Sequence, residues 1–317
     1  MDFEATVGSH VVILTEGALI ERLRRDATIA LDPHVLHAGF IYSASGRDAL
    51  RGLYTQYLDI GKAADLPMIV CTPTWRANPV RLQRAGLADK DVNRDAVRFL
   101  AAMRGEYGEY AGRVFIGGLV GCAGDAYKPG EALGAKEAAR FHGAQTKALA
   151  AAGVDFLLAA TLPNAGEAQG IAAAMAACRV PYALSFVVKG DGRLLDGTAL
   201  HDAVAAIDAS VNAPPLFYMV NCVHPTACEE AFASEASRAH RIAERVIGLQ
   251  ANASSKSPEE LDGLGQLDAD PPEVLTNAML RVRRRFGTRI LGGCCGTDHR
   301  HIAWLARRVK ESARPIL

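Results

Sequence analysis

Residues 154–188 form a strand–helix–strand unit that decides the fold. The unit begins with Val154-Asp155-Phe156-Leu157-Leu158-Ala159-Ala160, a mostly apolar run of the kind found in buried parallel strands. A helical stretch follows at 167–178, and a second apolar run completes the unit: Pro181-Tyr182-Ala183-Leu184-Ser185-Phe186-Val187-Val188. Strands alternating with helices of this length predict a parallel sheet covered by helices.

The same alternation extends in both directions from this unit. Eight strands, each followed by a helical stretch, are predicted at 11–15, 66–71, 113–120, 154–160, 181–188, 216–220, 246–251 and 289–291. The helices are predicted at 18–25, 47–64, 91–107, 135–152, 167–178, 200–210, 227–244, 272–286 and 300–311, with a polar loop at 254–272. Eight such units predict a single-domain (β/α)₈ TIM barrel over residues 1–317, a fold that usually needs about 250 residues plus insertions. The alternative is a doubly wound open sheet, whose dinucleotide-binding form is disfavoured because no Gly-x-Gly-x-x-Gly follows the first strand.

Composition excludes several classes of partner. Lys+Arg and Asp+Glu both number 35, so no basic excess points to a nucleic acid or a membrane surface. No apolar run of about 18 residues predicts a membrane-spanning helix. The acidic start, Met1-Asp2-Phe3-Glu4, is unlike a signal peptide, and seven scattered cysteines suggest reduced thiols. We therefore expect a cytoplasmic protein.

The most informative chemistry follows the last predicted strand, in Gly292-Gly293-Cys294-Cys295-Gly296-Thr297. Adjacent cysteines on a regular strand point to opposite faces, so both reach one site only if the backbone bends. The flanking glycines permit that bend. Two convergent thiolates suggest a soft metal such as zinc, and Cys222 is the leading candidate for a third ligand.

In a barrel, the active site lies at the carboxyl ends of the strands. Cys222 ends the sixth predicted strand and the cysteine pair ends the eighth, so the three thiols can converge above the barrel. A site with three cysteine ligands leaves one tetrahedral position open, as catalytic zinc sites do. Polar and glycine residues at other strand ends are candidate substrate contacts: Glu16, Gly17, Thr74, Ser185, Asn221 and Asn252.

The charge of such a centre indicates its chemistry. Three thiolates on a dication sum to −1, which makes a poor Lewis acid for activating water. A further thiol bound there would be deprotonated and would stay electron-rich. We therefore expect alkylation of a bound thiol by a methyl group carried on a sulfonium, a quaternary amine or cobalt.

Other interpretations of these residues are weaker. Cys294 and Cys295 as buried structural thiols, or as a vicinal disulfide, leave the glycines and Cys222 unexplained. His224 is better explained as a loop-ordering residue than as a ligand, because three cysteines suffice. The remaining cysteines are expected to be small hydrophobic residues: Cys71, Cys122, Cys178 and Cys228.

Asn221-Cys222, the glycine-flanked cysteine pair and His301-Ile302 resemble the homocysteine S-methyltransferase family. The resemblance covers nearly the whole chain and includes Thr161-Leu162-Pro163-Asn164, Glu167-Ala168, Ser185-Phe186 and Ala251-Asn252-Ala253. It implies a barrel with one zinc on Cys222, Cys294 and Cys295. It also implies methyl transfer from a small donor to homocysteine, which gives methionine.

Two positions depart from the family pattern. In the family, the first strand usually ends in Asp-Gly-Gly and the fourth in Glu-Thr-(Ile/Leu)-Pro, and these carboxylates help to hold the amino group of homocysteine. Here the two positions are Thr15 and Ala160, and Glu16 is one residue away from the first. Loss of a charge-assisted contact to an ammonium costs about 1.5–3 kcal/mol. We therefore hypothesise an acceptor thiol that lacks the α-ammonium or presents it differently.

Three alternatives remain at this point. The chain methylates a different thiol, or it takes its methyl group from a corrinoid within a larger system, although no corrinoid-binding module is apparent in the sequence. It could also be a non-enzymatic zinc-binding or redox-sensing barrel. For the leading hypothesis and the first alternative, the expected partners are a small-molecule thiol and a methyl donor.

Overall fold

The computed structural model describes residues 2–9, 11–234, 239–256, 260 and 267–312. Eight parallel strands close into a barrel in the order β1 to β8. They are β1 Ile13–Thr15, β2 Met68–Cys71, β3 Val114–Val120, β4 Phe156–Leu162, β5 Tyr182–Phe186, β6 Phe217–Val223, β7 Val246–Ala251 and β8 Ile290–Gly293. Because β1 pairs with β8 through Ile13–Ile290 and Leu14–Leu291, the sheet has no free edge. The predicted (β/α)₈ barrel is confirmed, and the open-sheet alternative is wrong.

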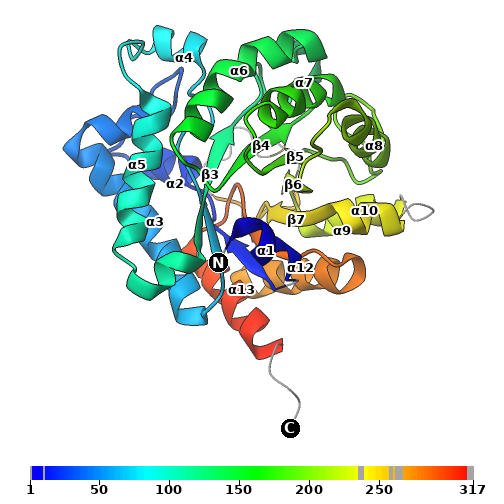
Figure 1. Ribbon diagram of the computed structural model, residues 1–317. Coiled ribbons are helices and arrows are strands. Elements are labelled where there is room, and N and C mark those ends of the chain that lie inside the picture. Colours follow the sequence, from blue (N-terminus) through cyan, green and yellow to red (C-terminus); the bar gives the residue numbers. More distant parts are fainter. Residues whose placement is uncertain (1, 10, 235–238, 257–259, 261–266, 313–317) are drawn as a thin grey trace.

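Helices surround the strands (Figure 1). Those between consecutive strands, and after β8, are α2 Ile20–Arg25, α3 Ala44–Ala64, α4 Pro79–Arg84, α5 Val92–Gly105, α6 Ala135–Ala151, α7 Ala165–Ala176, α8 Leu200–Ser210, α9 Pro225–Ser234, α10 Ala239–Arg245, α12 Pro272–Phe286 and α13 His299–Ser312. Short 3₁₀ turns occur at Ala38–Tyr42, Gly108–Arg113 and Pro129–Glu131. None of the helices in the described part of the chain is long and apolar enough to cross a membrane.

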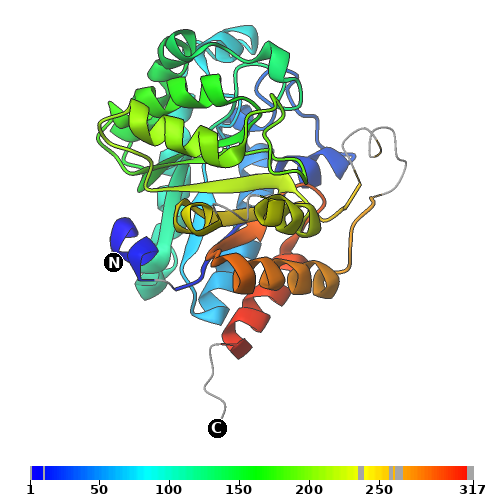
Figure 2. The ribbon, with the colours of Figure 1, turned by 90° about the vertical axis from the view of Figure 1, so that its right-hand side faces the viewer.

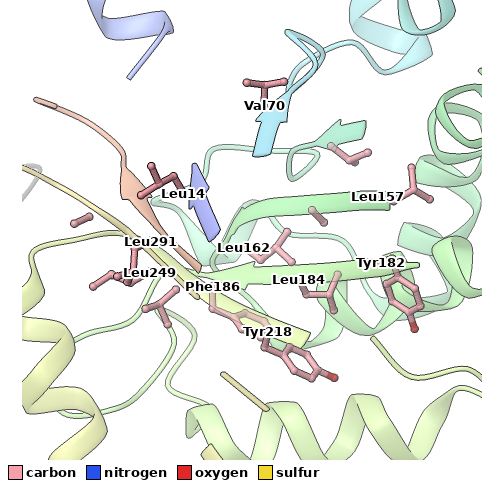
Figure 3. Close-up of a cluster of buried hydrophobic side chains, with 14 of the residues drawn as sticks. Leu14, Val70, Leu157, Leu162, Tyr182, Leu184, Phe186, Tyr218, Leu249 and Leu291 are labelled. Carbon is pink, nitrogen blue, oxygen red and sulfur yellow. The ribbon is translucent and has the colours of Figure 1, made fainter. Parts of the chain in front are cut away.

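Side chains alternate between two cores along each strand. On β4, Phe156, Leu158 and Ala160 face the barrel interior, whereas Leu157 belongs to the layer between strands and helices. Figure 3 shows part of this outer layer, with Leu157, Leu184 and Leu249 among its labelled side chains. The continuous apolar runs in the sequence reflect burial of both faces.

A short N-terminal helix, α1 (Phe3–Gly8), closes the end of the barrel where the strands begin. The Phe3 ring stacks on Phe156 with centroids 4.2 Å apart and lies 5.1 Å from Phe115. In Figure 2 this helix lies beside the starts of the strands, away from their carboxyl ends. The helix α1 has no counterpart among the helices predicted from the sequence.

Other boundaries differ from the predictions by a few residues. The helix predicted from residue 18 begins at Ile20, because Gly17 and Ala18 belong to the turn after β1. The short helix α4 lies where only loop was expected. The helix predicted at 227–244 corresponds to α9 and α10, with 235–238 outside the described residues. Much of the predicted polar loop at 254–272 also lies outside them.

Candidate metal centre

Three cysteine sulfurs converge at the carboxyl ends of the strands. The Sγ atoms of Cys222, Cys294 and Cys295 all lie within 4.8 Å of one another, and Cys222 Sγ is 2.7 Å from Cys294 Sγ. Cys222 belongs to β6 and the other two follow β8, so they flank β7 from both sides. All seven cysteines are free. The structure therefore brings together the three cysteines that the sequence analysis selected.

The donor set fits a single soft metal ion. Zinc–thiolate bonds of about 2.3 Å in a tetrahedral site place the sulfurs about 3.8 Å apart, a separation within the span observed here. Three thiols are soft donors that favour zinc over hard cations such as magnesium. Among the described residues, this is the one group of three or more Cys, His, Asp or Glu side chains whose donor atoms come this close.

A β-bulge directs Cys222 toward the other two cysteines. Asn221 pairs with Gln250 and Val223 with Ala251, so Cys222 is an extra residue on β6. Its φ is +55°, a left-handed conformation that is uncommon for a non-glycine residue. Strict alternation would turn this side chain toward the helices, because Asn221 faces inward. The bulge redirects it to the mouth of the barrel, as bulges near active sites often do.

Asn221 holds this bulge with all four hydrogen bonds of its side-chain amide. Its Nδ2 donates to Cys222 Sγ (3.2 Å) and to Thr161 Oγ1 (2.8 Å). Its Oδ1 accepts from the Thr161 backbone N–H (2.9 Å) and from Ser185 Oγ (2.6 Å). A carboxamide has two donors and two acceptor lone pairs, so none is left for a substrate. The structure therefore gives Asn221 and Ser185 partners within the protein.

The turn after β8 presents the cysteine pair. The Cys294 N–H donates to Ala251 O (2.7 Å), and Cys295 O accepts from the Ala253 N–H (2.9 Å). Gly296 then adopts φ +80°, which only glycine enters readily. Through these contacts the end of β7 holds the turn, and the two adjacent cysteines leave the regular strand alternation.

The three thiols form one hydrogen-bonded cluster. Hydrogen bonds from Cys294 and Cys295 lower the pKa of Cys222 well below that of an ordinary thiol. The pKa of Cys294 is raised, first of all by the hydrogen bond that Cys294 makes to Cys222. A thiolate at Cys222 is therefore favoured, with the protons held on its neighbours. A bound metal would replace those protons.

Tyr127, which the sequence analysis missed, reaches this cluster from the β3–α6 loop. Its hydroxyl is hydrogen-bonded to Cys222, while 38% of the residue stays exposed. Burial of the hydroxyl and then the negative charge of Cys222 raise the pKa of Tyr127 above its ordinary value. The loop is fixed by Glu167, whose Oε1 accepts from the Ala123 N–H (2.7 Å) and contacts His142 Nε2 (2.9 Å). No spacing pattern in the sequence marks Tyr127.

Glu16 and Gly17 lie against the protein's own groups. Both carboxylate oxygens of Glu16 accept from the Cys71 N–H, at 3.0 and 3.1 Å, and burial raises the pKa of Glu16 to about 8. A Cβ on Gly17 would come within 2.9 Å of Thr297 Oγ1 and of the Tyr57 hydroxyl. The Glu16 carboxylate therefore satisfies the backbone N–H of Cys71 at the end of β2. Gly17 lets the backbone pack closely against Thr297 and Tyr57.

Thr74 and Asn252 differ in how their polar atoms are used. Thr74 Oγ1 donates to Leu119 O (2.7 Å) and pairs with Thr72 Oγ1 (2.7 Å). Asn252 lies at the end of β7, between the two parts of the cysteine cluster, and is 7% exposed. Its Oδ1 is buried without a hydrogen-bond partner in the described structure. Of the candidate substrate contacts, Asn252 retains a free polar atom.

The two positions that depart from the family pattern carry no charge. Thr15 Oγ1 donates to Glu16 O (3.1 Å) and accepts from Gln250 Nε2 (3.0 Å). Ala160 contributes a methyl group to the interior, and its carbonyl accepts from Trp75 Nε1 (3.2 Å). Glu16 is turned toward β2 and does not replace the carboxylate.

Comparisons with known proteins agree with this geometry. A family model described as homocysteine S-methyltransferase matches residues 13–309. Homocysteine S-methyltransferase 4 of Zea mays is 24% identical over 294 residues, covering 85% of this chain and 82% of the relative. Homocysteine S-methyltransferase YbgG of Bacillus subtilis (strain 168) is 27% identical over 225 residues, covering 67% and 63%. The crystal structure of the metallated homocysteine methyltransferase MmuM from Escherichia coli shares the fold, with a TM-score of 0.71, 22% identity and coverage of 96% and 98%.

Proposed function

The chain belongs to the homocysteine S-methyltransferase family and is a methyltransferase, and we propose that it methylates a small thiol at a zinc ion held by Cys222, Cys294 and Cys295. The observation that carries the proposal is the convergence of these three sulfurs at the carboxyl ends of the barrel strands. Zinc bound there would supply an open position at which an acceptor thiol loses its proton and stays nucleophilic.

The residues around the cysteines have definite tasks in this reaction. Asn221 holds Cys222 in its strained conformation, so the donor set is formed before substrate arrives. Tyr127 donates a hydrogen bond to the Cys222 sulfur and so helps to lower the pKa of that thiol. During transfer, the acceptor sulfur forms a bond to the methyl carbon, the bond from that carbon to the donor breaks, and the thiol proton leaves to solvent.

Family membership makes homocysteine the first candidate acceptor, with methionine as the product. A second candidate is a thiol without an α-ammonium group. It is favoured by the neutral Thr15 and Ala160 side chains and by the engagement of the Glu16 carboxylate with the Cys71 N–H. The free Oδ1 of Asn252 supports a neutral hydrogen-bond acceptor for the substrate.

The reaction requires a small-molecule thiol and a methyl donor, and a corrinoid remains an alternative donor. Seven free cysteines support a reducing, cytoplasmic setting as part of this proposal. A barrel that only stores zinc or senses oxidants is the non-enzymatic alternative. That alternative predicts metal binding without methyl transfer.

The test uses the zinc-loaded protein with a panel of thiols. Each thiol is incubated with S-methylmethionine, betaine, methyltetrahydrofolate, S-adenosylmethionine or methylcobalamin, and methylated products are detected by mass spectrometry. We expect one thiol–donor pair to turn over, and Cys294→Ala to abolish zinc retention and turnover together. Full activity after complete removal of the metal would contradict the proposal.

A further inference from the structure

The short helix α2, which follows β1, lies directly against the turn that carries the cysteine pair. The backbone N–H of Gly296 donates a hydrogen bond to Glu21 Oε2, across 275 residues of sequence. Gly296 comes immediately after Cys295, so the contact is one peptide unit from a proposed metal ligand. Neither the family resemblance nor the spacing of residues singled out Glu21.

Two further hydrogen bonds connect the segment before Glu21 to the same turn. The Gly293 N–H donates to Glu16 O at 3.1 Å, and the Ala18 N–H donates to Thr297 Oγ1 at 3.2 Å. A Cβ on Gly17 would lie 2.9 Å from Thr297 Oγ1, so the packing between these segments is close. The residues after β1 therefore contact the turn both before and after its two cysteines.

The side chain of Glu21 is itself held in place. Its Oε1 forms an ion pair with Arg25 one helical turn later, and 23% of the Glu21 side chain is exposed. The Gly296 N–H faces this carboxylate, and the chain then turns away through a left-handed φ of +80°. A hydrogen bond to a charged acceptor is roughly twice as strong as one between neutral groups.

Cys295 needs such support more than the other two cysteines. The Cys222 sulfur accepts a hydrogen bond from the Asn221 side chain, and the Cys294 backbone N–H donates to the last residue of β7. Cys295 is the exposed member of the three. Its direction depends on the two peptide units that surround it. Thr297 Oγ1 donates to Cys294 O in the unit before it, and Ala253 and Glu21 hold the C=O and the N–H of the unit after it.

We infer that Glu21 is a positioning residue for the metal site, because its carboxylate holds the Gly296 N–H and thereby sets the direction in which Cys295 presents its sulfur. The inference rests on the proposed metal-binding role of the three cysteines. It makes α2 part of the metal site, since undocking α2 would leave the peptide unit that follows Cys295 held by Ala253 alone. Groups that orient metal ligands typically contribute 10- to 100-fold in metal affinity.

Three substitutions at Glu21 test the role of its hydrogen bond. Glu21→Ala removes the acceptor, and Glu21→Asp keeps the charge but shortens the reach by one methylene. Glu21→Gln keeps an oxygen acceptor of the same length without the charge. Glu311→Ala is the matched control, because it removes a Glu–Arg pair of the same i,i+4 spacing on α13.

The readouts are zinc affinity, by competition with a chromophoric chelator, and the absorption bands of the cobalt-substituted protein. Thermal unfolding of each metal-free variant checks folding. We expect Glu21→Ala and Glu21→Asp to bind zinc about 10- to 100-fold more weakly and to shift the cobalt bands. The zinc affinity of Glu21→Gln should stay within about threefold of the wild-type value. The zinc affinity of Glu311→Ala should not change.

The outcomes separate this inference from the proposed function. Wild-type affinity and unchanged cobalt bands in Glu21→Ala and Glu21→Asp would overturn the positioning role alone. A wild-type protein that binds no zinc would overturn both proposals. If Glu21→Ala does not fold, the comparison of Glu21→Asp with Glu21→Gln decides whether the hydrogen bond matters.

Discussion

Cys222 and Thr161 lie on different strands, yet both have left-handed backbone angles, with φ of +55° and +64°, and both are bonded to the side chain of Asn221. Both strands shift register at these residues. Non-glycine residues in this region each cost on the order of 1–3 kcal/mol and persist when their surroundings hold them. The strain therefore lies at the proposed metal site, and Asn221 is the group that stabilises it.

We predict that Asn221→Ala weakens zinc binding about 10- to 100-fold and lowers kcat/KM in parallel. The substitution removes four hydrogen bonds and leaves the buried Thr161 N–H without its acceptor, which costs about 1–3 kcal/mol. Chelator competition and steady-state kinetics measure the two effects. Ser185→Ala removes one of the four bonds and is the matched control, with a much smaller effect expected. Equal zinc affinity in Asn221→Ala and the wild type would show that the bulge is stable without the amide.

Glu16 gives a prediction about pH. Burial raises the pKa of Glu16 to about 8 from 4.5, so the folded protein keeps this carboxyl protonated after the unfolded chain has lost the proton. Its stabilising contribution is complete below about pH 4.5 and is lost as pH rises toward 8, at up to about 1.4 kcal/mol per pH unit. Glu16→Gln cannot ionise, so its stability relative to the wild type should increase over this window.

The measurement is the urea midpoint of the wild type and Glu16→Gln at several values from pH 5 to pH 8. Taking the difference cancels the titration of other groups that both proteins share. A difference for Glu16→Gln that does not change with pH would mean that the carboxylate ionises freely in its buried position.

Phe3 gives a prediction about stability without loss of chemistry. Phe3→Ala removes a ring that is 3% exposed and stacked on Phe156, so it should lower the free energy of unfolding by about 3–5 kcal/mol. The kcat of the folded protein should stay close to the wild-type value, because α1 lies at the opposite end of the barrel from the cysteines. Urea unfolding and kinetics on the same preparations test both statements.

Val11→Ala is the control for Phe3→Ala, because Val11 is 43% exposed and close in sequence. It should change stability by no more than about 0.5 kcal/mol. A large fall in kcat for folded Phe3→Ala would show that the two ends of the barrel are coupled.

The fold could be predicted from the sequence because strands buried on both faces appear as continuous apolar runs. That pattern is local and survives in a single sequence. The helix α1 could not be predicted, because it has six residues and no repeating apolar face, and Phe3 is ordered by rings contributed from Phe115 and Phe156. Its structure depends on the barrel that it closes.

The three cysteines could be selected from sequence because glycines beside Cys294 and Cys295 indicate a bend and barrel geometry brings Cys222 near them. The groups that support them depend on tertiary contacts. Glu16 turns toward β2 because β1 ends at Thr15 and leaves the Cys71 N–H without a strand partner. Tyr127 and Glu21 come from a loop and a short helix, where no periodic pattern reveals which group a side chain contacts.

The neutral positions Thr15 and Ala160 give a prediction about acceptor selectivity. We compare L-homocysteine with 4-mercaptobutanoate, which has the same thiol and carboxylate but no ammonium. Introducing carboxylates with Thr15→Asp and Ala160→Glu should raise the ratio of kcat/KM for homocysteine over the deaminated thiol. A charge-assisted hydrogen bond of about 1.5–3 kcal/mol corresponds to roughly 10- to 100-fold. Gln250 Nε2, which donates to Thr15 Oγ1, remains available as a donor to an aspartate at this position.

Ala160→Gln is the matched control, because it adds a side chain of the same size as glutamate without the charge. If charge recognition is the missing element, Ala160→Glu should raise the ratio and Ala160→Gln should not. If the wild-type kcat/KM for homocysteine already exceeds that for 4-mercaptobutanoate by about 10-fold or more, the hypothesis of an acceptor without an ammonium is wrong. The ammonium would then be held by groups other than the side chains at positions 15 and 160. Asn252, with its buried and unpartnered Oδ1, would be the first residue to substitute.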